Sequence, residues 1–205
     1  MTLETFQRKH TPLLVVLSGT AASGKDSLLR RMRERGVPFE FVVNVTSRPP
    51  RTGEADGADY HFVTESEFRE MIRKGELLEH AVVYGQYKGI PRRQVREAIA
   101  SGKDVILRID IQGAETIRQQ CPEAVTIFLT ASSSEELKRR LLERKTDSPE
   151  QVDLRLRTAC EEMEHISEFD YVVVNADGRL DDAVDTIAAI LRAEHCRTVP
   201  RKAVL

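Results

Sequence analysis

Tryptophan is absent from this chain of 205 residues, and aromatic residues make up only 5% of it. Cysteine is scarce as well: Cys121, Cys160 and Cys196 stand far apart, without the spacing of metal ligands. Such a set favours reduced thiols in the cytoplasm over a disulfide framework. No apolar run approaches the roughly 20 residues of a membrane-spanning helix, and the N-terminal segment lacks the apolar stretch of a signal peptide. We therefore expect a cytoplasmic protein that makes no membrane contact.

An excess of either charge is also missing, because 31 lysine and arginine residues face 33 aspartate and glutamate residues, giving a net charge of −2. A surface of this balance does not attract nucleic acid or anionic membranes, so any anion site has to be local. The length suits one α/β domain with small insertions. A composition of 40% hydrophobic and 31% charged residues is typical of globular proteins.

A glycine-rich segment at residues 17–27, LSGTAASGKDS, carries the clearest chemical signal. An apolar run precedes it and a helical pattern follows it, which is the layout of a phosphate-binding P-loop. The glycines let successive backbone N–H groups point at phosphate oxygens, and the helix N-terminus adds its positive dipole. Lys25 would reach the β- and γ-phosphates. The residues expected to surround the phosphates are Gly19, Thr20, Ala21, Ala22, Ser23, Gly24, Lys25, Asp26 and Ser27.

The residue after Lys25 departs from the P-loop pattern. Serine or threonine is usual there, because its hydroxyl binds Mg²⁺, whereas this chain has Asp26. A carboxylate is a hard oxygen ligand, so Asp26 is our candidate for holding Mg²⁺ directly or through water. It also brings negative charge toward the phosphates.

Short apolar runs alternate with helical patterns, which predicts βαβ units and a parallel sheet. The predicted strands are residues 13–17, 39–43, 105–109, 124–129 and 171–174. The predicted helices are residues 25–34, 92–101, 112–120, 134–145, 149–166 and 179–194. Ser132 with Glu135, and Ser133 with Glu136, both have the form of a capping box for the helix near 134. The predicted fold class is α/β, with a P-loop core, a parallel sheet and flanking helices.

Two segments interrupt this alternation of predicted strands and helices. Residues 44–91 are rich in Arg, Pro, Gly and Asp, with strand-like stretches at 60–63 and 77–83 and a short helix at 65–74. We expect them to form a small, mostly β inserted subdomain. Residues 144–155 are polar and lie between two helical patterns, which is typical of a mobile lid.

Arg48 and Arg51 flank a pair of prolines that keeps the chain extended. Two such guanidinium groups can bind a terminal phosphate bidentately, and Tyr60 follows closely enough to add a hydroxyl donor. A surface charge is the alternative for either arginine alone. We expect a second phosphate site here.

Glu79 lies in a strand-like segment, where a solvated glutamate is the ordinary interpretation. If it is buried, its carboxylate matches the N1–H and N2–H₂ donors of guanine, a pair that adenine lacks. Asp110 follows an apolar strand, at the edge where α/β folds bind ligands, although an aspartate there also caps helices. Arg108 lies inside the same strand, so we expect it to point at the site or at an acidic partner.

Arg140 and Arg144 share one helix face, and Arg155 lies on the other side of the predicted lid. Phosphoryl transfer needs positive charge around the equatorial oxygens, and closing arginines supply it. A salt-bridged helix surface is the alternative. Together with Lys25 and Arg48, these three arginines are the candidate catalytic residues.

The P-loop and the segments TSRPPRTGEADGADYHFV, ELLEHAVVYGQYKGIP, RIDIQGA and RRLLERKT together resemble guanylate kinase, over residues 13–194. They are most similar to the variant of plant organelles and some bacteria, which also has Asp after the P-loop lysine. The resemblance implies a core of residues 13–44, 92–142 and 158–195, a GMP-binding insert at 45–91 and a helical lid at 143–157.

The resemblance also implies roles for matching residues. Arg48, Arg51 and Tyr60 match ligands of the GMP phosphate, Glu79 and Asp110 match the carboxylates that face guanine, and Asn175 falls on the adenine side. Four positions depart from the family pattern. Asn44 replaces a common Ser and keeps a donor for guanine O6, Lys88 replaces a Tyr near the GMP phosphate, Ile90 replaces a Ser or Thr that helps to read the base, and Arg108 replaces the first Asp of a D-x-D pair.

We therefore expect ATP-dependent phosphorylation of GMP, and of dGMP, with Mg²⁺. The expected partners are GMP and ATP, with no nucleic acid, in a monomer or homodimer. Two alternatives remain. One is a non-catalytic guanylate-kinase-like module that binds phosphopeptides, against which Lys25 and the lid arginines argue. The other is a kinase of the same fold acting on a phosphorylated sugar, against which Glu79 argues.

Overall fold

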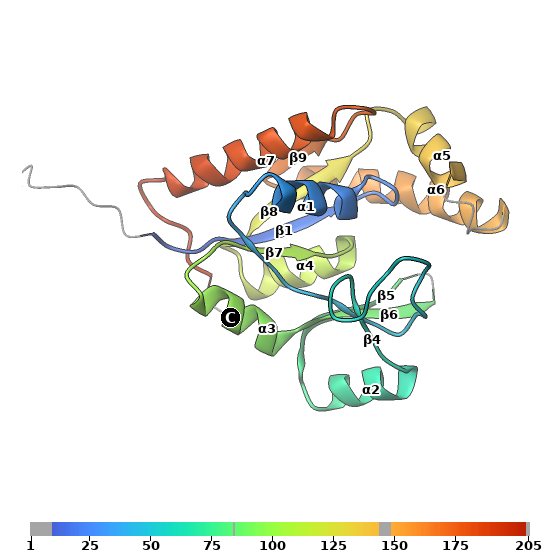
Figure 1. Ribbon diagram of the computed structural model, residues 1–205, viewed down its shortest axis with the longest axis horizontal. Helices are drawn as coiled ribbons and strands as arrows, with labels where there is room; N and C mark the ends of the chain where they lie inside the picture. Colours follow the sequence, from blue (N-terminus) through green and yellow to red (C-terminus); the bar gives the residue numbers. More distant parts are fainter. Residues whose placement is uncertain (1–9, 84, 144–148, 204–205) are drawn as a thin grey trace, which may run out of the picture.

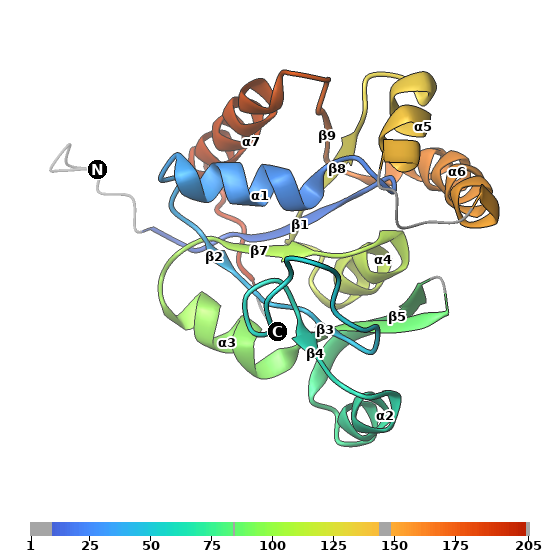
Figure 2. The ribbon, with the colours of Figure 1, turned by 45° about the vertical axis from the view of Figure 1, so that its right-hand side comes forward.

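The computed structural model describes residues 10–83, 85–143 and 149–203, except for the side chains of 149–151. Its core is a five-stranded sheet with the strand order β2-β7-β1-β8-β9, in which every pairing is parallel (Figure 1; Figure 2 also labels β2). The strands are β1 (Leu14–Gly19), β2 (Glu40–Phe41), β7 (Val105–Arg108), β8 (Val125–Thr130) and β9 (Tyr171–Val174). The predicted parallel α/β core is confirmed.

Helices cover both faces of this sheet (Figure 2). Along β1, Val15 and Leu17 pack on one side against α1 (Lys25–Glu34) and α7 (Leu180–His195). Leu14 and Val16 pack on the other side, in the core that α3 (Arg92–Ala100) and α4 (Ile111–Gln120) complete. A parallel strand buried on both faces has to be apolar throughout, which explains the unbroken run before the P-loop.

The insert forms a second sheet with the order β4-β3-β6-β5. Its strands are β3 (Val45–Thr46), β4 (His61–Phe62), β5 (Leu77–Val83) and β6 (Gln86–Pro91), and α2 (Glu65–Arg73) packs on it. Phe68 of α2 is completely buried in a small core of its own. The mostly β insert is thus confirmed. Two of its strands, β3 and β6, are absent from the sequence prediction.

Two helices, α5 (Ser134–Glu143) and α6 (Pro149–Glu164), flank residues 144–148, which lie outside the described residues. Ser133 Oγ accepts a hydrogen bond of 3.1 Å from the Glu136 amide, which decides between the two candidate capping boxes. The predicted helix at 149–166 corresponds to α6, so the second half of the polar segment 144–155 is helical. The helix begins at Pro149 because proline is well suited to the first turn of a helix. A short 3₁₀ helix, Ile166–Glu168, follows α6.

Among the described residues, no helix combines the length and the apolar character needed to cross a membrane. The parallel strands instead direct their carboxyl ends toward the insert and α6 (Figure 1). The P-loop leaves β1 at this edge, and Asp110 follows β7 there. The edge is therefore where a ligand site is expected.

Candidate active site

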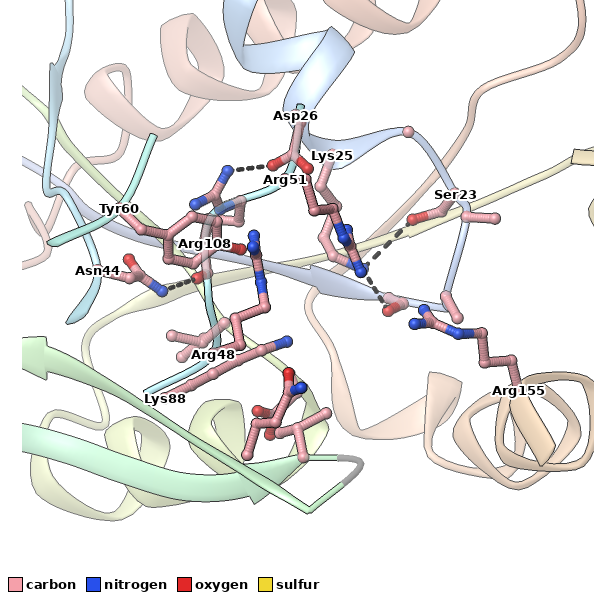
Figure 3. A pocket seen from close by; sticks show the side chains of 18 of the residues that line it. Ser23, Lys25, Asp26, Asn44, Arg48, Arg51, Tyr60, Lys88, Arg108 and Arg155 are labelled. Carbon is pink, nitrogen blue, oxygen red and sulfur yellow. Dashed lines mark hydrogen bonds and ion pairs between the residues drawn. The ribbon is translucent and has the colours of Figure 1, made fainter. Parts of the chain in front are cut away.

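A pocket of about 550 Å³ lies between the P-loop, the insert and α6 (Figure 3). Most of the residues expected from the sequence line it: Gly19, Ala21, Ala22, Ser23, Gly24, Lys25, Asp26, Ser27, Asn44, Arg48, Arg51, Tyr60, Glu79, Lys88, Asp110 and Arg155. Thr20, Arg140 and Asn175 are outside this lining, and Arg144 lies outside the described residues. Residues far apart in the sequence are thus gathered around one cavity.

Two residues outside the pocket lining, Asn175 and Arg140, support the P-loop. Gly24 has a φ of +91°, and a Cβ atom there would collide with the side-chain amide of Asn175. That amide donates a 2.8 Å hydrogen bond to the Ser23 carbonyl. Arg140 donates to the Asn175 carbonyl at 2.8 Å and also pairs with Glu136. Asn175 and Arg140 therefore hold the shape of the loop in this structure.

Lys25 folds back onto its own loop. Its Nζ donates to the Gly19 carbonyl at 2.6 Å and to the Thr20 carbonyl at 3.0 Å. Burial lowers the pKa of Lys25, and the nearby Glu162 carboxylate opposes that shift. A phosphate bound in the loop would offer the ammonium group stronger, charge-assisted partners than these carbonyls.

Glu162, on α6, is a site residue that the sequence analysis missed. Its Oε2 accepts a 3.0 Å hydrogen bond from the Ala21 amide of the P-loop. Burial raises the pKa of Glu162, and the Lys25 charge opposes that shift. Arg155 lies seven residues earlier, two turns along the same helix, and both line the pocket. Because Arg155 was already a candidate, its spacing of two helical turns from Glu162 could have revealed Glu162 in the sequence.

Arg108 links the P-loop to the insert. Its Nη1 pairs with Asp26, and its Nη2 donates to the Asp59 carbonyl at 3.0 Å. The guanidinium carbon lies 4.5 Å from the centre of the Tyr60 ring. Arg108 is only 8% exposed, whereas the Asp26 side chain is 58% exposed. The expectation that Arg108 points at the site and at an acidic partner is confirmed.

Arg48 is held in place by Glu54, which sequence reasoning also missed. Both Nη atoms of Arg48 lie 2.6 Å from Glu54 carboxylate oxygens, and its guanidinium carbon is 4.7 Å from the centre of the Tyr60 ring. The Glu54 carboxylate also accepts from the Arg51 amide at 2.8 Å. Arg48 is thus buried and pre-oriented, whereas the Arg51 side chain is exposed at the mouth of the pocket.

Glu79 is the most unusual group of the pocket. It is 4% exposed, and its Oε1 has no hydrogen-bond partner among the described residues. Burial raises the pKa of Glu79 to about 8, and the Asp110 carboxylate adds to the shift. A Cβ at Gly113 would lie 2.8 Å from Oε1, so the glycine of α4 leaves room for the carboxylate. A buried, unpartnered carboxylate needs donors, and a ligand can supply them.

Four further residues, for which the sequence suggested roles in binding, lie in the same part of the structure. The Asn44 amide nitrogen donates one hydrogen bond of 2.7 Å to the Arg108 carbonyl, which leaves its second N–H for an acceptor on a ligand. The Asn44 oxygen has no hydrogen-bond partner among the described residues. Burial lowers the pKa of Lys88 to about 8. Asp110 accepts from the Gly113 amide at 3.0 Å and so also caps α4. Ile90 is completely buried in the core beneath α3 and α4.

Comparisons with known proteins agree on one family. The guanylate kinase family model matches residues 11–194. The chain is 48% identical to guanylate kinase 2, chloroplastic/mitochondrial, of Oryza sativa subsp. japonica, over 92% of this chain and 68% of that protein. It is 44% identical to the guanylate kinase of Halalkalibacterium halodurans, over 92% of each chain. The crystal structure of guanylate kinase from Anaplasma phagocytophilum superimposes with a TM-score of 0.77 at 34% identity, covering 93% of this chain and 89% of that one.

Replacement of Glu79 by glutamine is expected to raise the melting temperature, Tm, of the ligand-free protein at pH 8. An unfolded glutamate ionises near pH 4.5, whereas the folded Glu79 has a pKa of about 8. Stability from the protonated carboxyl is therefore complete below pH 4.5 and is lost as the pH rises through 8. Because glutamine does not ionise, the Tm difference should be near zero at pH 4.5 and grow up to pH 8. At pH 8 the difference in the free energy of unfolding should be about a few kcal/mol, and each kcal/mol shifts Tm by roughly 2–4 °C.

Thermal melts between pH 4.5 and 9 test this expectation. Glu76→Gln, at an exposed position just before β5, is the matched control and should show no growing difference. A Glu79→Gln effect that is constant across the pH range would mean that packing, rather than ionisation of the buried carboxylate, causes it.

Proposed function

The chain belongs to the guanylate kinase family, and we propose that it transfers the γ-phosphoryl group of ATP to GMP, and to dGMP, forming ADP and the guanine nucleoside diphosphate. The observation that carries this proposal is the buried Glu79 carboxylate with its unpartnered oxygen. Guanine presents N1–H and N2–H₂ side by side, which matches two carboxylate oxygens. Adenine would leave the carboxylate without these bonds, and a buried unsatisfied charge is strongly disfavoured.

The GMP phosphate is expected to bind between Arg48, Arg51, Tyr60 and Lys88, all of which line the pocket. Arg48 is oriented by Glu54 and by the Tyr60 ring, so little side-chain freedom is lost when phosphate binds. Lys88 has a pKa lowered by burial, and a phosphate dianion beside it would favour its charged form. This arrangement explains how the ammonium of Lys88 can serve where a tyrosine is usual.

ATP is expected to place its phosphates in the P-loop, with Lys25 exchanging its carbonyl partners for phosphate oxygens. Asn175 and Arg140 keep the loop in shape from behind, and Arg155 approaches from α6. The donor set suits Mg²⁺ through Asp26, whose exposed carboxylate is a hard oxygen ligand at the start of α1. Held there, Mg²⁺ would supply positive charge to neutralise the phosphate oxygens. Because Arg108 already pairs with Asp26, the metal would share that carboxylate with a buried guanidinium.

The transfer itself needs position and charge more than covalent participation by the protein. The P-loop and the insert would hold donor and acceptor phosphates on facing walls of one pocket. Arg48 and Lys25 would neutralise charge at either end, and Arg144 and Arg155 would supply more on closure. Arg140, the third arginine expected there, would act through the P-loop that it supports. Closing the lid would also exclude water, which otherwise competes as an acceptor.

The oligomeric state and the cellular location are also part of this proposal. The described residues of one chain line a pocket that reaches from the P-loop to the insert, which supports our proposal of a monomer or a homodimer. The three cysteines are unpaired, which suits a reducing compartment such as the cytoplasm. The rice relative is named as chloroplastic/mitochondrial, so an organelle is the competing location for this chain.

An acceptor panel tests the function. ADP release from ATP should be measured with GMP, dGMP, AMP, CMP, UMP and ribose bisphosphate, with and without Mg²⁺. We expect turnover with the two guanine nucleotides alone, and only with Mg²⁺. Turnover of the sugar phosphate would identify the same-fold kinase instead. GMP binding without any turnover would identify the non-catalytic module.

Gly113→Ala should raise the KM for GMP by about tenfold or more and leave the KM for ATP nearly unchanged. The new methyl group would lie 2.8 Å from the Glu79 carboxylate and displace it from the position that reads guanine. Glu79→Gln should act on the same constant, because one acceptor oxygen becomes a donor facing the guanine N–H groups. Steady-state kinetics with each substrate varied in turn measure both effects.

Gln112→Ala, at the exposed neighbouring position of α4, serves as the control for helix perturbation. Equal increases of both Michaelis constants in Gly113→Ala would argue against a guanine-reading role for Glu79.

The pairing of Asp26 with Arg108 should appear as coupling in a double-mutant cycle. Arg108→Asp should reduce kcat/KM strongly, because two carboxylates would then face the phosphates and the contact with Asp59 would be lost. Asp26→Ser should cost less, because serine keeps a hard oxygen ligand for Mg²⁺. The combination of both replacements should recover part of the loss, with a coupling free energy of about 1 kcal/mol or more.

Magnesium-dependent kcat/KM of the four proteins measures this cycle. Arg30→Ala, at an exposed position of α1 that does not line the pocket, controls for general damage to that helix. Strictly additive losses would show that Asp26 and Arg108 act separately.

A further inference from the structure

Three potential metal ligands meet at the end of the core opposite the pocket. His10 precedes β1, Asp104 immediately precedes β7, and His195 is the last residue of α7. One ligand atom from each lies within 4.8 Å of the others. They lie at the amino ends of β1 and β7, whereas the P-loop leaves the carboxyl end of β1. The six residues of β1 separate the two ends by about 20 Å.

Asp104 is the fixed member of this cluster. It is 6% exposed, and its Oδ1 accepts a 3.0 Å hydrogen bond from the Leu13 amide. Its Oδ2 lies 2.8 Å from His195 Nε2. The rings of His10 and His195 are 4.6 Å apart between centres, tilted by 59°. The carboxylate is therefore oriented by the backbone toward one imidazole, and a second imidazole stands beside the first.

We propose that His10, Asp104 and His195 bind Zn²⁺. Two imidazoles and one carboxylate form a common zinc donor set, with water as the fourth ligand of a tetrahedron. Ligand bonds of about 2.0–2.1 Å place neighbouring ligand atoms about 3.3 Å apart. His195 and Asp104 would separate slightly to admit the ion, and the exposed His10 would close on it. Mg²⁺ and Ca²⁺ prefer sets made of oxygen alone, so imidazoles favour Zn²⁺.

A simpler role for the cluster is a hydrogen bond that fastens α7 to the core. His165 and Glu168 show what that simpler arrangement looks like: they are joined at 2.7 Å, both are more exposed, and they lie three residues apart in sequence. Across the described ranges, only the cluster of His10 brings three such side chains together. The third ligand and the buried, backbone-oriented carboxylate are what distinguish a metal site from a surface pair.

Bound Zn²⁺ would join three separate parts of the chain at the base of the sheet. It would fasten the segment before β1 and the end of α7 to β7, and so stabilise the folded state. The phosphoryl-transfer groups are at the opposite edge, so this zinc would act on stability and take no part in the reaction.

The test uses the full-length protein without a histidine tag, freed of metal with EDTA and dialysed. Zinc chloride is titrated in competition with a chromophoric chelator, and Tm is measured with and without the ion. We expect one zinc ion per chain and a higher Tm when it is bound. His10→Ala should weaken zinc binding by at least about tenfold and abolish the Tm increase. His10 is exposed and its loss leaves the contact between Asp104 and His195 intact, so this variant should fold.

His165→Ala is the matched control and should bind zinc like the original chain. Cobalt(II) should give the visible absorption of a tetrahedral site, and His10→Ala should lose that absorption. No zinc uptake would overturn the proposal. Uptake that His10→Ala leaves unchanged would overturn it equally, because the ion would then be bound elsewhere, for instance by the carboxylates of the pocket.

Discussion

The ion pair between Asp26 and Arg108 joins the two halves of the candidate active site. Asp26 belongs to the start of α1 and Arg108 to the end of β7, and Arg108 also holds the Asp59 carbonyl and stacks on Tyr60 of the insert. The P-loop and the insert therefore both contact the buried guanidinium group of Arg108. Both residues depart from the usual family pattern, and the structure shows that the two departures belong together: an acid in the loop is balanced by a base in the strand.

Around this junction the protein holds charged groups in surroundings that disfavour their ionisation. Burial raises the pKa of Glu79 and Glu162 and lowers that of Lys25 and Lys88. Each shift reduces the stability of the ligand-free fold at neutral pH. Phosphate groups would relieve the shifts of Lys25 and Lys88, and N–H donors of a base would relieve that of Glu79. The site is thus preorganised at the expense of stability, as is common where binding has to be selective.

The parts that the sequence predicts well are those with a strong local cause. The P-loop fixes the order of β1 and α1, and alternating apolar runs locate β7, β8 and β9. The short strands β3 and β6 escaped prediction because their pairing is made in the tertiary fold: β3 has two residues and β6 contains Gly89 and Pro91. Glu162 was missed for a similar reason, since the Ala21 amide that it accepts from is far away in the sequence. Glu54 is close to Arg48 in the sequence, but only the turn at residues 51–54 shows that the two side chains meet. The zinc cluster likewise joins residues 10, 104 and 195.

Helix α6 carries an acid and a base toward the same phosphate loop, with Glu162 on the Ala21 amide and Arg155 two turns away. An incoming triphosphate repels the first group and attracts the second. Since both side chains belong to α6, the repulsion and the attraction act on the same helix. A charge placed in the loop would therefore act on α6 through both groups, and a nucleotide without its terminal phosphate would act on it more weakly.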